Sequence, residues 1–157
     1  MTDAAGAPPA RRAPAHRFTD LEPGAVFESY RRTVTETDLV TFTNWAGLRL
    51  PIFIDDEHAR TVGPHGGRIV PGFLTASLSA GMMETLLGPG VLAGLGMDAF
   101  RFHVPVRPGD TLRLRMTVTE RRETRDPSRG VVSVANEMIN QRDEVVLGFR
   151  TSVLMAV

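Results

Sequence analysis

The side chains best suited to acid–base or metal chemistry gather within residues 55–65. Asp55, Asp56 and His58 lie within four positions, and His65 follows in a loop rich in glycine and proline. Two carboxylates and an imidazole can bind a divalent metal or take up a proton. The same residues would also form an exposed acidic helical turn, stabilised by the helix dipole. We favour this plainer interpretation and expect no metal site.

Other single residues could contact a ligand, and each has a structural alternative. His65 could swing from its loop into a pocket, although a loop histidine more often faces solvent. Arg49 is the one charge in an apolar run. It could clamp a carboxylate or phosphate, reach out to solvent or pair with Asp55. Trp45 could stack on a ligand, but we favour core packing, and we expect His103 at the surface or at an interface.

The stretch from Gly72 to Leu87 predicts a long helix, which must position any such site. Only Glu84 of its sixteen residues is charged, and apolar side chains fall on every face. A helix without a polar face has to be enclosed, so we expect other elements to wrap it. It is too short for a bilayer span, which takes about twenty strongly apolar residues. At Gly72, free N–H groups and the positive end of the helix dipole converge.

The segments around this helix predict an α+β fold with an antiparallel sheet. Strand patterns cover residues 26–34, 91–102, 111–122, 131–140 and 145–155. One long apolar helix followed by consecutive antiparallel strands suggests a curved sheet wrapped around the helix.

Between the first strand and the long helix, the chain predicts a shorter helix and a connection. Thr35 or Thr37 would cap the helix, which runs to Trp45. Residues 48–54 are apolar apart from one arginine and are interrupted by Pro51, so we expect an irregular, buried connection.

Composition bounds the class of protein. The chain has 157 residues, 18 basic and 18 acidic side chains and no cysteine. One domain is expected at this length, over residues 17–157, after a disordered tail of alanine, proline and arginine at residues 1–16. Balanced charge argues against nucleic-acid or membrane partners. Without cysteine there are no disulfides or thiolate sites, and without a signal peptide pattern we expect the cytoplasm.

Two stretches resemble a known family. Residues 66–74 read Gly-Gly-Arg-Ile-Val-Pro-Gly-Phe-Leu, and residues 102–112 read Phe-His-Val-Pro-Val-Arg-Pro-Gly-Asp-Thr-Leu. They resemble the MaoC-like branch of the hotdog superfamily, which includes R-specific enoyl-CoA hydratases and acyl dehydratases. The likeness covers about residues 18–157. It implies a hotdog fold with a central helix at 72–87, usually in a dimer, and acyl-thioester substrates. It implies no cofactor beyond the CoA or acyl carrier protein that carries the substrate.

The resemblance places the family's catalytic pair on residues that transfer no protons. The hydratase motif reads roughly Gly-Asp-x-Asn-Pro-(Leu or Ile)-His, and residues 47–53 here are Gly-Leu-Arg-Leu-Pro-Ile-Phe. Leu48 replaces the aspartate and Phe53 the histidine. Leu50 replaces the asparagine, and Pro71 a second histidine. Hydration needs a base for water and an acid for the α carbon, and hydrocarbon side chains supply neither. We therefore predict that R-specific hydration is absent or very weak.

One functional element of the family is retained, because it is backbone. The resemblance assigns to the amide of Gly72 a part in polarising the thioester carbonyl. A glycine at that position could equally serve only to let the helix start close to another element. The residues expected to contact substrate are Trp45, Arg49, Leu50, Pro71 and Phe73.

Three interpretations remain open. The first is a lyase-type enzyme that acts on an acyl or polyketide-like substrate in a remodelled, apolar pocket, by positioning and desolvation. The second is a non-catalytic subunit that pairs with a homologue carrying the aspartate and histidine. The third is a homodimer that binds acyl thioesters without chemistry.

Overall fold

The computed structural model describes residues 17–157, so the tail expected at residues 1–16 lies outside the described residues. The helices are α1 (Glu36–Trp45), α2 (Pro51–Ile54), α3 (Asp56–Thr61) and α4 (Gly72–Leu87), with short 3-10 turns at Phe18–Asp20 and Gly88–Gly90. The strands are β1 (Val26–Glu28), β2 (Arg32–Thr33), β3 (Val91–Phe102), β4 (Thr111–Glu123), β5 (Arg129–Ile139) and β6 (Val145–Ala156).

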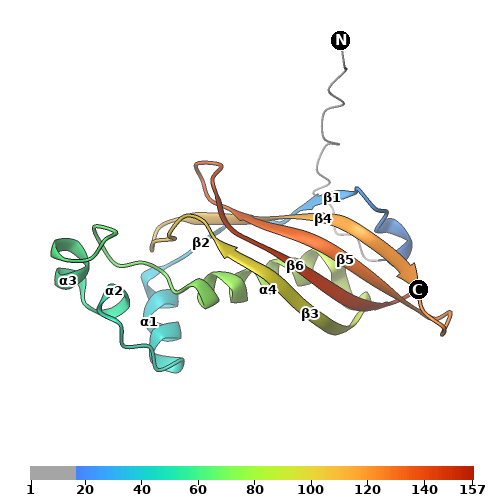
Figure 1. The fold of residues 1–157 in the computed structure, drawn as a ribbon, viewed down its shortest axis with the longest axis horizontal. Coiled ribbons are helices and arrows are strands. Elements are labelled where there is room, and N and C mark those ends of the chain that lie inside the picture. Colours follow the sequence, from blue (N-terminus) through green and yellow to red (C-terminus); the bar gives the residue numbers. More distant parts are fainter. Residues whose placement is uncertain (1–16) are drawn as a thin grey trace, which may run out of the picture.

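The strands form one antiparallel sheet in the order β1-β4-β5-β6-β3, and β2 also pairs with β4. The strands β4, β5 and β6 follow one another as a meander, while β3 pairs with β6 at the edge. The sheet is curved, and α4 lies along its inner side (Figure 1). The expected α+β arrangement is confirmed, and the long helix spans residues 72–87 as predicted.

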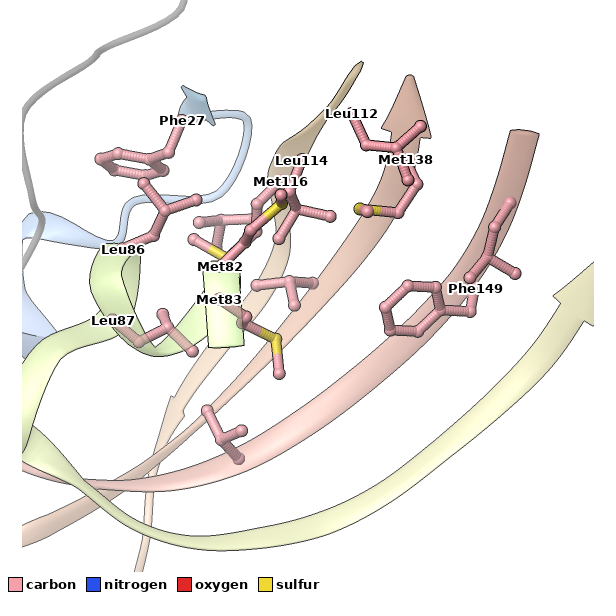
Figure 2. Packing of buried hydrophobic residues seen from close by; sticks show 14 of the residues in the cluster. Phe27, Met82, Met83, Leu86, Leu87, Leu112, Leu114, Met116, Met138 and Phe149 are labelled. Carbon is pink, nitrogen blue, oxygen red and sulfur yellow. The ribbon is translucent and has the colours of Figure 1, made fainter. Parts of the chain in front are cut away.

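Alternation along the strands explains which side of the sheet is buried. On β4, Leu112, Leu114 and Met116 are fully buried, while the arginines between them lie on the outer side. From α4, Met82 and Leu86 point toward this inner surface (Figure 2). Burial of these apolar side chains is what holds the helix against the sheet.

The helix α4 has one open side in the single chain. Met82 and Leu86 are buried, but Phe73 is 74% exposed, and Ser77 and Glu84 are exposed as well. The expectation that the helix is enclosed all round is therefore wrong for one chain, because the sheet covers only one side. Within residues 17–157, no helix combines the length and apolar character that a membrane crossing requires.

The expected first strand is interrupted. Residues 26–34 form two short strands, β1 and β2, that pair with different parts of β4. The break at Ser29–Arg31 follows from a side-chain bond, since Ser29 Oγ accepts from the amide of Leu114 at 2.9 Å.

We call the helices α1 to α3, residues 36–61, the overhang, because they project beyond the end of the sheet near the start of α4 (Figure 1). Thr35 caps α1 as expected, in a reciprocal capping box with Asp38. The irregular connection expected at residues 48–54 is wrong: Pro51 opens the short helix α2, a position where its missing N–H costs nothing. This segment is not buried, and Leu50 is 58% exposed.

Polar contacts join the overhang to the segment that precedes α4. Arg68 pairs with Glu36 of α1 at 2.6 Å and with Asp56 of α3 at 3.5 Å. The amide of Ile69 donates to the carbonyl of Ile52 in α2 at 3.1 Å. These contacts fix the overhang relative to the start of α4, together with the burial of Leu39 in α1 and Ala59 in α3.

Candidate functional site

The amino end of α4 has free hydrogen-bonding capacity. Pro71 precedes the helix and offers no side-chain cap, while its carbonyl accepts from the amides of Leu74 and Thr75 at 2.9 and 3.3 Å. The amides of Gly72 and Phe73 belong to the first turn, where a helix has no internal acceptors. Together with the helix dipole, they favour an electron-rich oxygen at this end.

An apolar cavity of about 420 Å³ lies at this end of α4. Its walls come from the start of α4, from the loop before it and from the chain that follows β3. The lining residues are His65, Ile69, Val70, Gly72, Phe73, Thr75, Phe102, His103, Val104, Pro105, Val106 and Val146. A carbonyl oxygen held at the amide of Gly72 would therefore sit in largely apolar surroundings, where a hydrogen bond is stronger than in water.

The ring of Phe102 explains why residue 72 is glycine. A Cβ atom on Gly72 would lie 2.7 Å from two carbons of that ring, which is closer than carbon atoms approach. The glycine thus permits a close contact between α4 and the end of β3. This structural reason is compatible with a role for its amide.

The structure brings His65 to the same cavity. His65 lies on the loop before α4, half-buried. The guanidinium of Arg107 donates to the backbone carbonyl of His65, and the amide of Arg107 donates to Asp110 at 2.8 Å. The turn after β3 therefore holds the loop in place, and His65 is a titratable side chain in the cavity wall with Gly72.

His103 also borders the cavity, but its ring lies elsewhere. The Nε2 atom of His103 is 3.6 Å from the place that a Cβ on Gly148 would occupy, and the side chain is exposed. Gly148 alternates on β6 with Leu147 and Phe149, which are buried in the core. The ring of His103 therefore lies on the outer side of the sheet.

The residues predicted to replace the family's catalytic pair do not line the cavity at Gly72, which we call the Gly72 cavity. Leu48 and Phe53 are half-buried in the overhang and are not among the lining residues. One hydrogen bond joins this segment to the cavity wall, from the amide of Ile69 to the carbonyl of Ile52. The structure brings Gly72, Phe73 and His65 together in that wall, whereas Leu48, Leu50 and Phe53 are not part of it.

Trp45 and Arg49 are surface residues. Trp45 is 83% exposed, so the expectation of core packing is wrong; its ring lies 6.2 Å from that of Phe42, beside a shallow hollow separate from the Gly72 cavity. Arg49 is exposed and donates to the carbonyl of Leu48 at 2.7 Å. It forms no ion pair with Asp55, whose carboxylate accepts from the amide of His58 at 2.9 Å.

The acidic cluster is structural. Asp55 caps α3, and Asp56 faces Arg60 at 3.7 Å and Arg68 at 3.5 Å. Among residues 17–157, no three histidines or carboxylates come close enough together to hold a metal ion. The contacts of Asp55 and Asp56 are those of a capped, exposed helical turn, as in the plainer interpretation of this cluster.

Sequence reasoning missed the wall that follows β3. Phe102, Val104 and Val106 line the Gly72 cavity. In the sequence they count only as part of the stretch that resembles the family, and they are not predicted to contact a ligand. The available signal was the proline turn at residues 105–110, which folds this stretch back toward the start of α4.

Comparison with known proteins agrees with the family resemblance found in the sequence. The family model for the MaoC like domain matches residues 19–140. Protein MaoC of Klebsiella aerogenes is 35% identical over 100 residues, which is 64% of this chain and 30% of that protein. The (R)-specific enoyl-CoA hydratase of Rhodospirillum rubrum is 30% identical over 105 residues, 66% of this chain and 70% of that protein. The double-hotdog protein Rv0216 of Mycobacterium tuberculosis superposes with a TM-score of 0.77 at 26% identity, over 89% of this chain and 44% of that one.

Proposed function

Because this chain belongs to the MaoC-like hydratase and dehydratase family and has a hotdog fold, we propose that it binds an acyl thioester carried by CoA or by acyl carrier protein. The chain spans only 30% of the Klebsiella relative and 39% of the next curated relative, a dehydratase from Chloroflexus aurantiacus. The activity proposed here therefore rests on the residues of this chain.

One observation carries the proposal: α4 opens without a side-chain cap, at Gly72, in the wall of an apolar cavity of about 420 Å³. The thioester carbonyl oxygen would accept a hydrogen bond from the amide of Gly72, with the helix dipole behind it. The acyl group would fill the apolar space, and Phe73 would contact it at the helix start.

R-specific hydration of an enoyl thioester is absent or very weak in this proposal. Leu48 and Phe53 occupy the positions of the family's aspartate and histidine, and neither has a titratable proton. Loss of general acid–base catalysis costs about two to four powers of ten in rate. His65, the titratable side chain with Gly72 in the cavity wall, is the residue that would sustain a residual rate or a different proton transfer.

A second candidate function, as a non-catalytic subunit of a hydratase or dehydratase, is favoured by the free edge of β3. In the described chain β3 pairs only with β6, and its exposed side chains include Leu92, Leu95, Met97 and Phe102. An open apolar edge strand is a surface that proteins cover. A second hotdog chain would cover it, either a copy of this chain or a homologue that carries the aspartate and histidine.

The test separates binding from turnover. Isothermal titration with butyryl-CoA should show binding, whereas trans-2-butenoyl-CoA should be hydrated slowly or not at all. The double change Leu48→Asp with Phe53→His should raise hydration at least about tenfold, and Leu48→Asn with Phe53→Gln, which adds polarity without a comparable acid or base, should not. Fast hydration by the unchanged chain would overturn the loss of activity. Failure to bind any acyl-CoA or acyl carrier protein would overturn the proposed function.

Assembly distinguishes the two candidates. Light scattering of the purified chain should show a dimer if the β3 edge joins two copies. A chain that stays monomeric alone, and that forms a stable complex with a homologue carrying the aspartate and histidine, would favour the subunit function.

A further inference from the structure

A second hollow, distinct from the Gly72 cavity, lies between the later half of α4 and β3. It measures about 340 Å³ and is mostly apolar. The residues that line it are Ala80, Met83, Glu84, Leu87, Val91, Gly94, Gly96, Met97, Thr151 and Val153. Cβ atoms added to Gly94 or Gly96 would meet nothing within 4 Å, so the β3 side of this groove is open space rather than packed core.

One wall of the groove carries a buried polar pair. Thr151 is 3% exposed and lines the groove; Asn136, on the neighbouring strand β5, is 1% exposed. The amide nitrogen of Asn136 donates to the hydroxyl oxygen of Thr151 at 3.2 Å. The other amide atom, Oδ1, is buried and has no partner. If the amide were turned over, its nitrogen would be the atom left without one, so the pair keeps an unmet hydrogen bond in either orientation.

These two residues break an otherwise apolar pattern. On β5, Val134 and Met138 flank Asn136 on the inner side of the sheet and are fully buried. On β6, Val153 takes the same place next to Thr151. A buried polar group without a full set of hydrogen bonds destabilises the fold relative to an apolar side chain of the same size. The pair is therefore costly for the fold, and a ligand group that completes its bonding would remove that cost.

We propose that the Asn136–Thr151 pair selects an acyl chain that carries a hydroxyl group. When Thr151 accepts from Asn136, as the hydrogen bond stands here, its own proton can be donated to a ligand oxygen in the groove. With the amide turned over, Thr151 donates to Asn136 and its oxygen can accept from a ligand hydroxyl instead. A hydroxyl both accepts such a bond and donates one in return, whereas a plain alkyl chain does neither. Thr151 is the contact residue, and Asn136 positions it. This inference rests on the proposed function, since it concerns the tail of the same bound thioester.

The geometry also bears on chain length. Ala80 lies eight residues after Gly72, which corresponds to about 12 Å along a helix. A thioester held at Gly72 therefore reaches the groove only with an acyl chain of medium length.

The experiment compares ligands that differ by one hydroxyl. Dissociation constants are measured by isothermal titration for dodecanoyl-CoA and for a set of hydroxydodecanoyl-CoA isomers with the hydroxyl placed along the far half of the chain. At least one isomer should bind about tenfold more tightly than dodecanoyl-CoA, the effect of one net hydrogen bond. Thr151→Val should abolish the preference and Thr151→Ser should keep it. Asn136→Leu should reduce it, and Ser133→Ala, which removes a surface-side bond to Ser152 between the same strands, should leave it unchanged.

The outcomes separate this inference from the proposed function. Equal binding of dodecanoyl-CoA and every isomer, or a preference that survives Thr151→Val, would overturn the inference while acyl-thioester binding stands. If the pair only holds a buried water, Thr151→Val should lower the melting temperature of the protein without changing its ligand preference. That result would also overturn the inference. Absence of binding by all these thioesters would remove the proposed function and this inference together. Thr151→Val conserves volume, so the test does not depend on whether Asn136→Leu folds.

Discussion

The sheet with α4 and the overhang are held together by different forces. In the first region, side chains from α4 and four strands share one apolar core, and most of them are fully buried. In the overhang, Leu39 and Ala59 are buried, whereas Trp45, Leu50 and Ile54 are exposed. A capping box and the ion pairs of Arg68 stabilise it further. One region is specified by extensive apolar packing, and the other by a few buried side chains together with polar contacts.

This difference bears on the proposed replacement of the family's catalytic pair. Leu48 and Phe53, which we predict to hold the positions of that pair, lie in the overhang and outside the main core cluster. Gly72, by contrast, lies where α4 meets Phe102, and the close approach of that ring leaves no room for a side chain at this position. In the overhang, side chains that transfer protons could therefore be replaced without disturbing the core. At the helix start, a residue larger than glycine cannot replace Gly72 without meeting the ring of Phe102.

The largest expected effect is the loss of a core leucine. Leu86 is 3% exposed on the inner side of α4, so Leu86→Ala should lower the free energy of unfolding by about 2–5 kcal/mol, through lost transfer energy and the cavity left behind. The matched change Leu50→Ala in the overhang should cost no more than about 0.5 kcal/mol. Denaturant unfolding measures both, and equal losses would break the distinction between the two regions.

Substitutions of two glycines in α4 test whether packing is tighter at the start of the helix than along its open side. Gly72→Ala places a Cβ atom 2.7 Å from the ring of Phe102, and such overpacking should destabilise the fold by about 1–3 kcal/mol. Gly81→Ala has nothing within 4 Å to meet, and alanine's better helix propensity should stabilise the protein by up to about 1 kcal/mol. Calorimetric melting gives both shifts. The same sign for both changes would mean that the contact of α4 with Phe102 is not tight.

Most of the core could be predicted from the sequence, because its apolar residues follow clear patterns along the strands and the long helix. Alternation on β4 and the long apolar run at residues 72–87 correctly indicated the strand and the helix. The sequence offers Thr35 or Thr37 as the cap of α1, and the structure selects Thr35, which forms a capping box with Asp38. Apolar character alone did not show that one side of α4 stays open, because small residues are tolerated on either surface.

The candidate site was less predictable, because long-range contacts build it. Phe102 reaches Gly72 from thirty positions away along the chain, and Arg107 holds the loop of His65. Nothing local indicates such contacts. The expectation for Trp45 is wrong for a related reason. A large aromatic ring favours burial, but the buried side of α1 carries Leu39 and Thr43, and Trp45 lies on another side of that helix.

Acid should weaken the overhang first. Burial alone would raise the pKa of Asp38, but hydrogen bonds from the amide and hydroxyl of Thr35 and from Arg32 outweigh it and lower that pKa below its usual value. A carboxyl with a lowered folded-state pKa stabilises above the unfolded pKa, near 3.9, and loses this contribution as the pH falls through the folded value.

Asp38→Asn tests this contribution. At neutral pH it should cost about 1 kcal/mol, as for the loss of a capping interaction. The difference in unfolding free energy between the original chain and the variant should shrink as the pH falls below about 4. A difference that stays constant across this range would show that the charge of Asp38 does not support the cap of α1.

The smallest expected effect is at Trp45. In a single chain, Trp45→Ala removes a ring that is 83% exposed and touches little beyond Phe42, so the unfolding free energy should change by no more than about 0.5 kcal/mol. Measured at several protein concentrations, the loss should stay small if the overhang remains open to solvent. A loss that grows as the protein is concentrated would mean that a second chain covers the ring, since stability gained by association depends on concentration. The overhang would then have its apolar partner in another copy, and its exposed side chains would belong to an interface.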